Sequence, residues 1–230
     1  MPFFIPPDCI PARRLVMRTT LRITEIFHSL QGETRRMGLP TVFVRLTGCP
    51  MRCGYCDSAY AFTGGKTVEI DVVMQQIRDF GCKTICVTGG EPLAQKAVHL
   101  LFQQLCDEGF DVSVETGGGQ PIDTVDSRVS RVLDIKTPGS GEMHNMHWPN
   151  VDAVNQNDEI KFVLVDRADY EWARDKVRAE QLDLRAPVIF SPVWESLKPA
   201  DLAQWVIDDR LPVRVQVQLH KILWGDKPGV

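Results

Sequence analysis

Two absences narrow the class of protein before any motif is considered. The chain has no continuous apolar run near the roughly 20 residues that a membrane-spanning helix needs. Its first residues also lack the charged start and apolar stretch of a signal peptide. Positive charge is not in excess, because 26 Lys and Arg stand against 30 Asp and Glu, a net charge of −4. Nucleic-acid-binding surfaces need clustered Lys and Arg opposite the phosphates. We therefore expect a cytoplasmic protein that binds no membrane and makes no direct contact with nucleic acid.

A fourth cysteine is missing from the most informative segment of the chain. Cys49, Cys53 and Cys56 are spaced C-x3-C-x2-C in GCPMRCGYCD, residues 48–57, called the cysteine loop below. Iron–sulfur clusters are normally held by four cysteine thiolates, so three of them predict a cubane cluster with one iron open to an outside ligand. A structural zinc site would need a second knuckle, and His28, the nearest upstream histidine, lies in a strand-like stretch. Zinc or a merely buried set of thiols is the alternative.

The other four of the seven cysteines are scattered among apolar residues. Cys9, Cys82, Cys86 and Cys106 are therefore interpreted as small hydrophobic side chains. A secreted disulfide framework belongs to shorter chains with an ordered cysteine spacing. We expect no such framework here.

Alternating strands and helices are predicted along the rest of the chain. Apolar, β-branched segments predict strands at residues 21–28, 41–47, 84–88, 111–116, 132–136, 160–165, 187–192 and 213–219. Helical patterns with start and stop signals follow Asp71 up to Gly81 and span about 92–107, 168–179 and 200–208. Such strands indicate a parallel sheet with helices on its outer face. A full eight-unit barrel needs about 250 residues, so we predict an α/β fold that is an incomplete barrel, with its site at the carboxyl ends of the strands.

Residues 1–20 differ in composition from the rest. Four prolines and the pair Arg13-Arg14 occur there, and we predict a disordered N-terminal extension, with Met17 as a plausible true start. Residues 21–230 are predicted to form a single domain, since this length fits one α/β domain.

The cysteine loop and a later glycine pair together resemble the radical S-adenosylmethionine superfamily. The predicted strand 84–88 ends in Gly89-Gly90-Glu91-Pro92, about 30 residues after the cysteine loop. A glycine pair alone more often answers a steric need at a turn. In that superfamily, the methionine part of S-adenosylmethionine occupies the open iron, and the Gly-Gly-Glu segment binds its amino group. The resemblance implies the partial TIM-like barrel of radical S-adenosylmethionine enzymes. It also explains the absence of a fourth cysteine, because the cofactor occupies the open iron.

A wider set of segments carries a second, narrower resemblance. The segments are SLQGE (29–33), VRLTGC (44–49), YCDS (55–58), TGGEP (88–92), ETGG (115–118), LDIKTP (133–138), SP (191–192) and QLHKILWG (218–225). Together they resemble one family within that superfamily, the 7-carboxy-7-deazaguanine synthases. The resemblance implies a homodimeric lyase that converts 6-carboxy-5,6,7,8-tetrahydropterin into 7-carboxy-7-deazaguanine with loss of ammonia, in queuosine and related 7-deazapurine biosynthesis. It also implies reductive cleavage of S-adenosylmethionine, a radical that takes hydrogen from the substrate, and flavodoxin or ferredoxin as electron donor.

The resemblance further implies roles for individual residues. Cys49, Cys53 and Cys56 would ligate a 4Fe-4S cluster, and Ser58 would bind Mg²⁺, since a hydroxyl oxygen suits a hard cation. The implied cofactor-binding residues are Tyr55, Cys56, Asp57, Gly89, Gly90, Glu91, Glu115, Thr116, Asp134, Ile135, Lys136, Ser191 and Pro192. An alternative stays open for two of the residues named in this paragraph. For Ser58 it is a loop cap, and for Lys136 it is an ordinary charge at a strand end.

The implied substrate-binding residues come mainly from the LQGE turn. They are Leu30, Gln31, Gly32, Glu33, Arg45, Thr88 and His220. The Arg45 guanidinium offers two parallel donors to a substrate carboxylate; the alternative is a buried ion pair with Glu33 or another acid. His220 would face the substrate, or be a satisfied structural group at a strand end.

Two other functions stay open from the sequence. A glycyl-radical activating enzyme shares the cysteine spacing and the shortened barrel, but the LQGE turn and Arg45 suit a small carboxylated heterocycle. An iron–sulfur carrier or a metal-stabilised binding module would not need the Gly-Gly-Glu-Pro segment.

Overall fold

The computed structural model describes residues 19–225, 227 and 229. Most of the predicted N-terminal extension, including Cys9 and Met17, lies outside these residues. Thr20, within the predicted extension, is the first residue of strand β1. Among the described residues, no helix has the length and apolar character needed to cross a bilayer.

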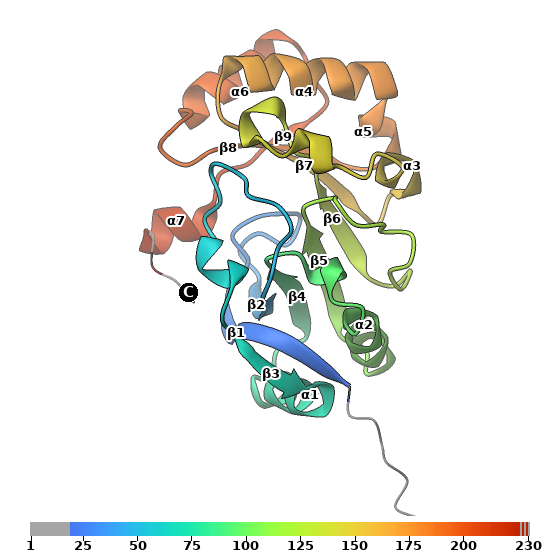
Figure 1. The fold of residues 1–230 in the computed structure, drawn as a ribbon. Coiled ribbons are helices and arrows are strands. Elements are labelled where there is room, and N and C mark those ends of the chain that lie inside the picture. Colours follow the sequence, from blue (N-terminus) through green and yellow to red (C-terminus); the bar gives the residue numbers. More distant parts are fainter. Residues whose placement is uncertain (1–18, 226, 228, 230) are drawn as a thin grey trace, which may run out of the picture.

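One curved sheet organises the molecule (Figure 1). Its nine strands lie in the order β3-β1-β2-β4-β5-β6-β7-β8-β9. Their bounds are β1 Thr20–Leu30, β2 Pro40–Leu46, β3 Lys66–Glu69, β4 Thr84–Gly89, β5 Asp111–Thr116, β6 Ser130–Asp134, β7 Glu159–Leu164, β8 Val188–Pro192 and β9 Arg214–Val215. The first and last strands of this order do not pair with each other, so the sheet is an incomplete barrel, as predicted.

The sheet is parallel from β2 to β9 but not at its beginning. Strand β1 pairs antiparallel with both β2 and β3, whereas each later neighbouring pair is parallel. The sequence analysis missed β3, which has four residues and only Val68 as an apolar member. A strand this short, with no fully buried residue, shows no apolar alternation that could be recognised in the sequence.

Helices cover the outer face of the sheet and lie around it in Figure 1. The longer ones are α1 Ile70–Asp79, α2 Val98–Asp107, α4 Arg167–Glu180 and α6 Pro199–Asp208. Short helical segments are α3 Asn150–Ala153, α5 Leu182–Arg185, α7 Leu219–Trp224 and the 3₁₀ turns η1 Ala59–Phe62, η2 Pro92–Ala94, η3 Pro138–Ser140 and η4 Met143–Asn145. Apolar side chains of β2, β4 and β5, such as Val44, Val87 and Val114, are fully buried in the core.

Two predicted elements were partly wrong, and both differences affect the site. The helix predicted from Pro92 is interrupted. The Glu91 carboxylate accepts from the Leu93 amide at 3.0 Å and caps the short turn η2, but the backbone of Gln95 is extended, and α2 begins only at Val98. The strand predicted at 213–219 ends after Val215. The Gln216 side chain there bonds the backbone of Thr34 instead, and the chain then turns into α7. His220 therefore lies on a helix and not at a strand end.

Candidate active site

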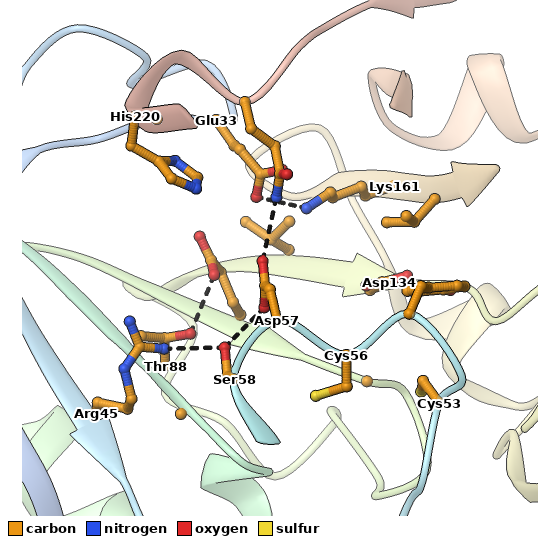
Figure 2. A pocket seen from close by; sticks show the side chains of 18 of the residues that line it. Glu33, Arg45, Cys53, Cys56, Asp57, Ser58, Thr88, Asp134, Lys161 and His220 are labelled. Atoms are coloured by element: carbon orange, nitrogen blue, oxygen red, sulfur yellow. Dashed lines mark hydrogen bonds and ion pairs between the residues drawn. The ribbon is translucent and has the colours of Figure 1, made fainter. Parts of the chain in front are cut away.

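A cavity of about 460 Å³ opens at the carboxyl ends of the parallel strands, where the incomplete barrel was expected to carry its site. All three cysteines of the cysteine loop line it. So do all the predicted cofactor- and substrate-binding residues except three, namely Glu91, Ile135 and Ser191. The structure thus brings together, around one cavity, residues that are up to 190 positions apart in the sequence (Figure 2), from Leu30 to His220.

The glycine pair at the end of β4 lies against the backbone at the end of β2 and the start of the cysteine loop. The Gly90 amide donates to the Leu46 carbonyl at 3.0 Å, and the Glu91 amide donates to the Gly48 carbonyl at 2.7 Å. A Cβ atom on Gly90 would collide with that Gly48 carbonyl. Gly89 has a φ of +136°, which side chains rarely adopt. The pair therefore has a steric role in seating the cysteine loop, beside the cofactor contact that the resemblance implies.

The three thiols are in an environment that opposes their ionisation. Burial raises the pKa of Cys49, Cys53 and Cys56, and the nearby ammonium of Lys136 acts in the opposite direction. Thiols bind iron as thiolates, so cluster binding must release protons here. Within the described residues, no group of three or more His, Cys, Asp or Glu side chains is already gathered around one metal position. The fit to a cluster rests on the donor type, three thiols on one cavity wall.

Lys136 and its neighbours form the wall next to the cysteines. Its ammonium is 2.8 Å from Asp134 Oδ2 and 5.8 Å from the centre of the Tyr55 ring. Burial works against the charge, but Asp134 raises the pKa of Lys136 above its usual value. Asp134 Oδ1 and the Tyr55 hydroxyl are buried without a hydrogen-bond partner among the described residues. Lys136 is thus a buried ion-pair member, and two polar atoms beside it are left for a ligand.

Of the three predicted residues that do not line the cavity, Glu91 and Ile135 bond residues that do. Both Glu91 carboxylate oxygens accept from the Thr116 hydroxyl, and Oε2 also accepts from the Gly117 amide at 2.8 Å. The Ile135 amide donates to the carbonyl of Lys161 at 2.8 Å. Ser191 is buried at the end of β8.

Arg45 lies at the other end of the cavity, in an ion pair that the sequence analysis had only as an alternative. Its partner is Glu25, with the guanidinium Nε 2.7 Å from Oε1, and not Glu33. The guanidinium also lies 5.7 Å from the ring centres of both Phe27 and Tyr60, and Nη1 is 3.4 Å from the Ser58 hydroxyl. The ion pair engages only Nε of the guanidinium. The two Nη nitrogens can therefore donate to other acceptors.

A buried acid–base cluster lies between the LQGE turn and the sheet. The ammonium of Lys161 on β7 is 2.5 Å from Glu33 Oε2. Glu115 accepts from the Thr88 hydroxyl at 3.0 Å and from the Gln31 amide at 3.4 Å. The resemblance implied a cofactor role for Glu115, whereas its contacts are to two residues of the implied substrate set. Burial and the neighbouring charge of Glu33 raise the pKa of Glu115.

The sequence analysis missed Glu25 and Lys161. The sequence does mark both residues, because each is a charged residue inside an otherwise apolar strand pattern, Glu25 in TEIFH and Lys161 in IKFVL.

His220, a predicted substrate-binding residue, lines the cavity. Its ring packs so closely against Gly32 that a Cβ atom on Gly32 would collide with the His220 Nδ1 atom. Burial lowers the pKa of His220.

Comparisons with known proteins agree with this arrangement. A family model described as the Radical SAM superfamily matches residues 43–131. The 7-carboxy-7-deazaguanine synthase of Chlorobaculum tepidum is 44% identical to this chain, over 91% of this chain and 97% of that protein. The synthase of Koribacter versatilis is 40% identical, over 89% and 97%. The crystal structure of QueE from Escherichia coli has the same fold, with a TM-score of 0.73 at 20% identity over 89% of this chain and 96% of that one.

These relatives do not favour an activating enzyme or an iron–sulfur carrier. They extend over the cysteine loop, the Gly-Gly-Glu segment and the LQGE turn, which all meet at the cavity. The chain is a radical S-adenosylmethionine enzyme and belongs to the 7-carboxy-7-deazaguanine synthase family.

Proposed function

We propose that this enzyme converts 6-carboxy-5,6,7,8-tetrahydropterin into 7-carboxy-7-deazaguanine, with loss of ammonia, on the route to queuosine and related 7-deazapurines. One observation carries the proposal. The three thiols of the cysteine loop and the Arg45, Glu33 and Gln31 side chains open on the same cavity. A site for radical generation and a site for a carboxylated heterocycle are therefore adjacent.

The chain's own residues fit the cofactors that the family uses. Cys49, Cys53 and Cys56 would hold the 4Fe-4S cluster, and the unpartnered Tyr55 and Asp134 atoms beside Lys136 are suited to the polar groups of S-adenosylmethionine. When bound, the cluster and this cofactor supply the one-electron cleavage that starts the radical chemistry. The protein's part is to bind, to orient and to keep water away from the reacting atoms.

The substrate would be held at two opposite ends of the cavity. The Nη edge of Arg45 matches the two oxygens of the pterin carboxylate. Glu33 Oε1 is buried without a hydrogen-bond partner among the described residues, and a carboxylate oxygen accepts from the amino and ring N–H groups of a pterin. His220 and Thr88 also line the cavity and complete the proposed substrate contacts.

Magnesium is proposed to bind at Ser58. The Ser58 hydroxyl donates to Asp57 Oδ1 at 2.8 Å, which places a hydroxyl and a carboxylate oxygen together at the cavity wall, and oxygen ligands are those that Mg²⁺ takes. Removing Mg²⁺ with a chelator should lower product formation, and Mg²⁺ should restore it. An unchanged rate in metal-free buffer would remove this ion from the proposal.

Three further parts of the proposal concern the enzyme's surroundings. Flavodoxin or ferredoxin would reduce the cluster, because the chemistry needs an external one-electron donor. The enzyme would act in the cytoplasm, where thiols stay reduced. It would be a homodimer, as the family resemblance implies, and the exposed Ile222, Leu223 and Trp224 of α7 supply apolar surface. Analytical ultracentrifugation tests the dimer directly.

The reaction is tested with anaerobically reconstituted enzyme. S-adenosylmethionine, a reductant, Mg²⁺ and the carboxylated tetrahydropterin are added, and products are followed by mass spectrometry. Formation of 7-carboxy-7-deazaguanine supports the proposal. Release of 5'-deoxyadenosine and methionine without that product would keep the radical chemistry but reject the substrate.

A further inference from the structure

We propose that Lys161 is a positioning residue for the substrate, and that its ammonium fixes the Glu33 carboxylate so that Oε1 is the acceptor for the pterin. The inference rests on the proposed function, because it concerns the same substrate. It adds a residue that none of the recognised motifs contains.

The geometry ties Lys161 to one of the two Glu33 oxygens. The Lys161 ammonium is 2.5 Å from Oε2, whereas Oε1 has no hydrogen-bond partner among the described residues although it is buried. Both side chains line the cavity and are about nine-tenths buried. In Figure 2 the Lys161 side chain extends from the strand directly to Glu33. One oxygen is thus occupied by the protein and the other is left for a ligand.

The backbone around Glu33 is held as firmly as its side chain. The Glu33 amide donates to the Gln31 side chain at 3.2 Å, and the next amide, of Thr34, donates to Gln216 at 2.6 Å. Lys161 itself projects from the middle of β7, between β6 and β8. A carboxylate fixed at both its backbone and one oxygen has little freedom left to lose when a ligand binds.

The surrounding charges explain why a lysine is needed at this place. Two buried carboxylates, Glu33 and Glu115, lie near Lys161, and Asp134 is its neighbour on β6. Burial disfavours the ammonium, but these acids raise the pKa of Lys161 above its usual value. Lys161 therefore stays charged and acts electrostatically; it is not suited to accept a proton in the reaction.

The test is a double-mutant cycle on substrate binding, measured with the reconstituted holoenzyme and S-adenosylmethionine. The probe is 6-carboxypterin, whose fluorescence reports binding without turnover. Lys161→Met should weaken its binding about 10- to 100-fold, the range for losing a charge-assisted hydrogen bond. Binding of S-adenosylmethionine, measured separately, should change less than about threefold. Lys198→Met, at an exposed position before α6, is the matched control and should leave both affinities unchanged.

The second half of the cycle distinguishes positioning from direct contact and does not depend on the stability of the single variant. Glu33→Gln leaves the Lys161 ammonium beside Glu115 and Asp134, and the double variant Glu33→Gln/Lys161→Met removes both charges. Neither variant therefore has the unpaired Glu33 carboxylate that Lys161→Met leaves. If Lys161 acts through Glu33, the two variants should bind the probe equally, within about threefold. A further tenfold loss in the double variant would show that Lys161 contacts the substrate itself and would overturn the inference. Lys161→Arg should restore part of the binding.

Two results separate this inference from the proposed function. If wild-type holoenzyme binds the probe and Lys161→Met binds it equally well, Lys161 has no positioning role, while the substrate assignment stands. If wild-type holoenzyme does not bind the probe at all, the substrate assignment falls and the inference falls with it.

Discussion

Replacing Arg45 by methionine tests whether this residue recognises the substrate carboxylate. The Arg45 side chain is 14% exposed and uses Nε for Glu25, so the Nη edge would make the substrate contact with little screening by solvent. Truncating one partner of such a pair costs about 2 to 5 kcal/mol. Because Nε already bonds Glu25 and Nη1 is 3.4 Å from the Ser58 hydroxyl, we expect about 3 kcal/mol, which is about 100-fold in the dissociation constant.

The assay compares two fluorescent ligands that differ only in the carboxylate, 6-carboxypterin and pterin. Wild-type holoenzyme should prefer the carboxylated ligand by about 100-fold, and Arg45→Met should bind both ligands almost equally. The variant should stay folded, since Glu25 keeps the bond from Tyr60 at 2.8 Å. Arg78→Met, which breaks an exposed pair with Glu108 at the end of α1, is the control. If Arg45→Met keeps the preference for the carboxylate, the reasoning is refuted.

Three other changes have expected outcomes. Cys53→Ala should leave too few thiolates for a cubane cluster, so iron content and cluster absorbance after reconstitution should be lost, whereas Cys82→Ala should keep both. Gly90→Ala should displace the cysteine loop, because its Cβ would collide with that loop's backbone. It should reduce iron uptake, unlike Gly54→Ala, whose Cβ would meet nothing within 4 Å; equal iron contents would contradict the steric argument. Phe162→Ala removes a fully buried ring from the core and should cost about 3 to 5 kcal/mol in urea unfolding; a loss under about 1 kcal/mol would show that the site collapses around it.

The parallel part of the fold was predictable because its strands are buried on both faces. Segments such as TICVT and IKFVLV are almost wholly apolar, and Gly or Pro bounds the helices between them. The antiparallel edge was not predictable in the same way, since β3 is short and none of its residues is fully buried. The prediction for the last strand was wrong for another reason. VRVQVQL has ideal strand alternation, but the Gln216 side chain accepts a hydrogen bond from the backbone amide of Thr34, 182 positions away.

The candidate site was predictable where function requires a local pattern. The spacing of the three cysteines and the LQGE turn are contained within a few residues each, so the sequence displays them directly. Lys161 and Glu25 were not found, because their contacts are to partners outside their own strands, Glu33 at 128 positions and Arg45 at 20 positions along the chain. The ion pair that was the alternative for Arg45 exists, but its acid could be chosen only once β1 and β2 were paired in register.

The central claim is that one cavity combines radical generation with binding of a carboxylated pterin. The most direct measurement is product analysis by mass spectrometry after anaerobic reconstitution with S-adenosylmethionine, reductant, Mg²⁺ and 6-carboxy-5,6,7,8-tetrahydropterin. We expect 7-carboxy-7-deazaguanine and an equal amount of ammonia. Cleavage of S-adenosylmethionine at the same rate with and without the pterin, and no deazaguanine product, would contradict it.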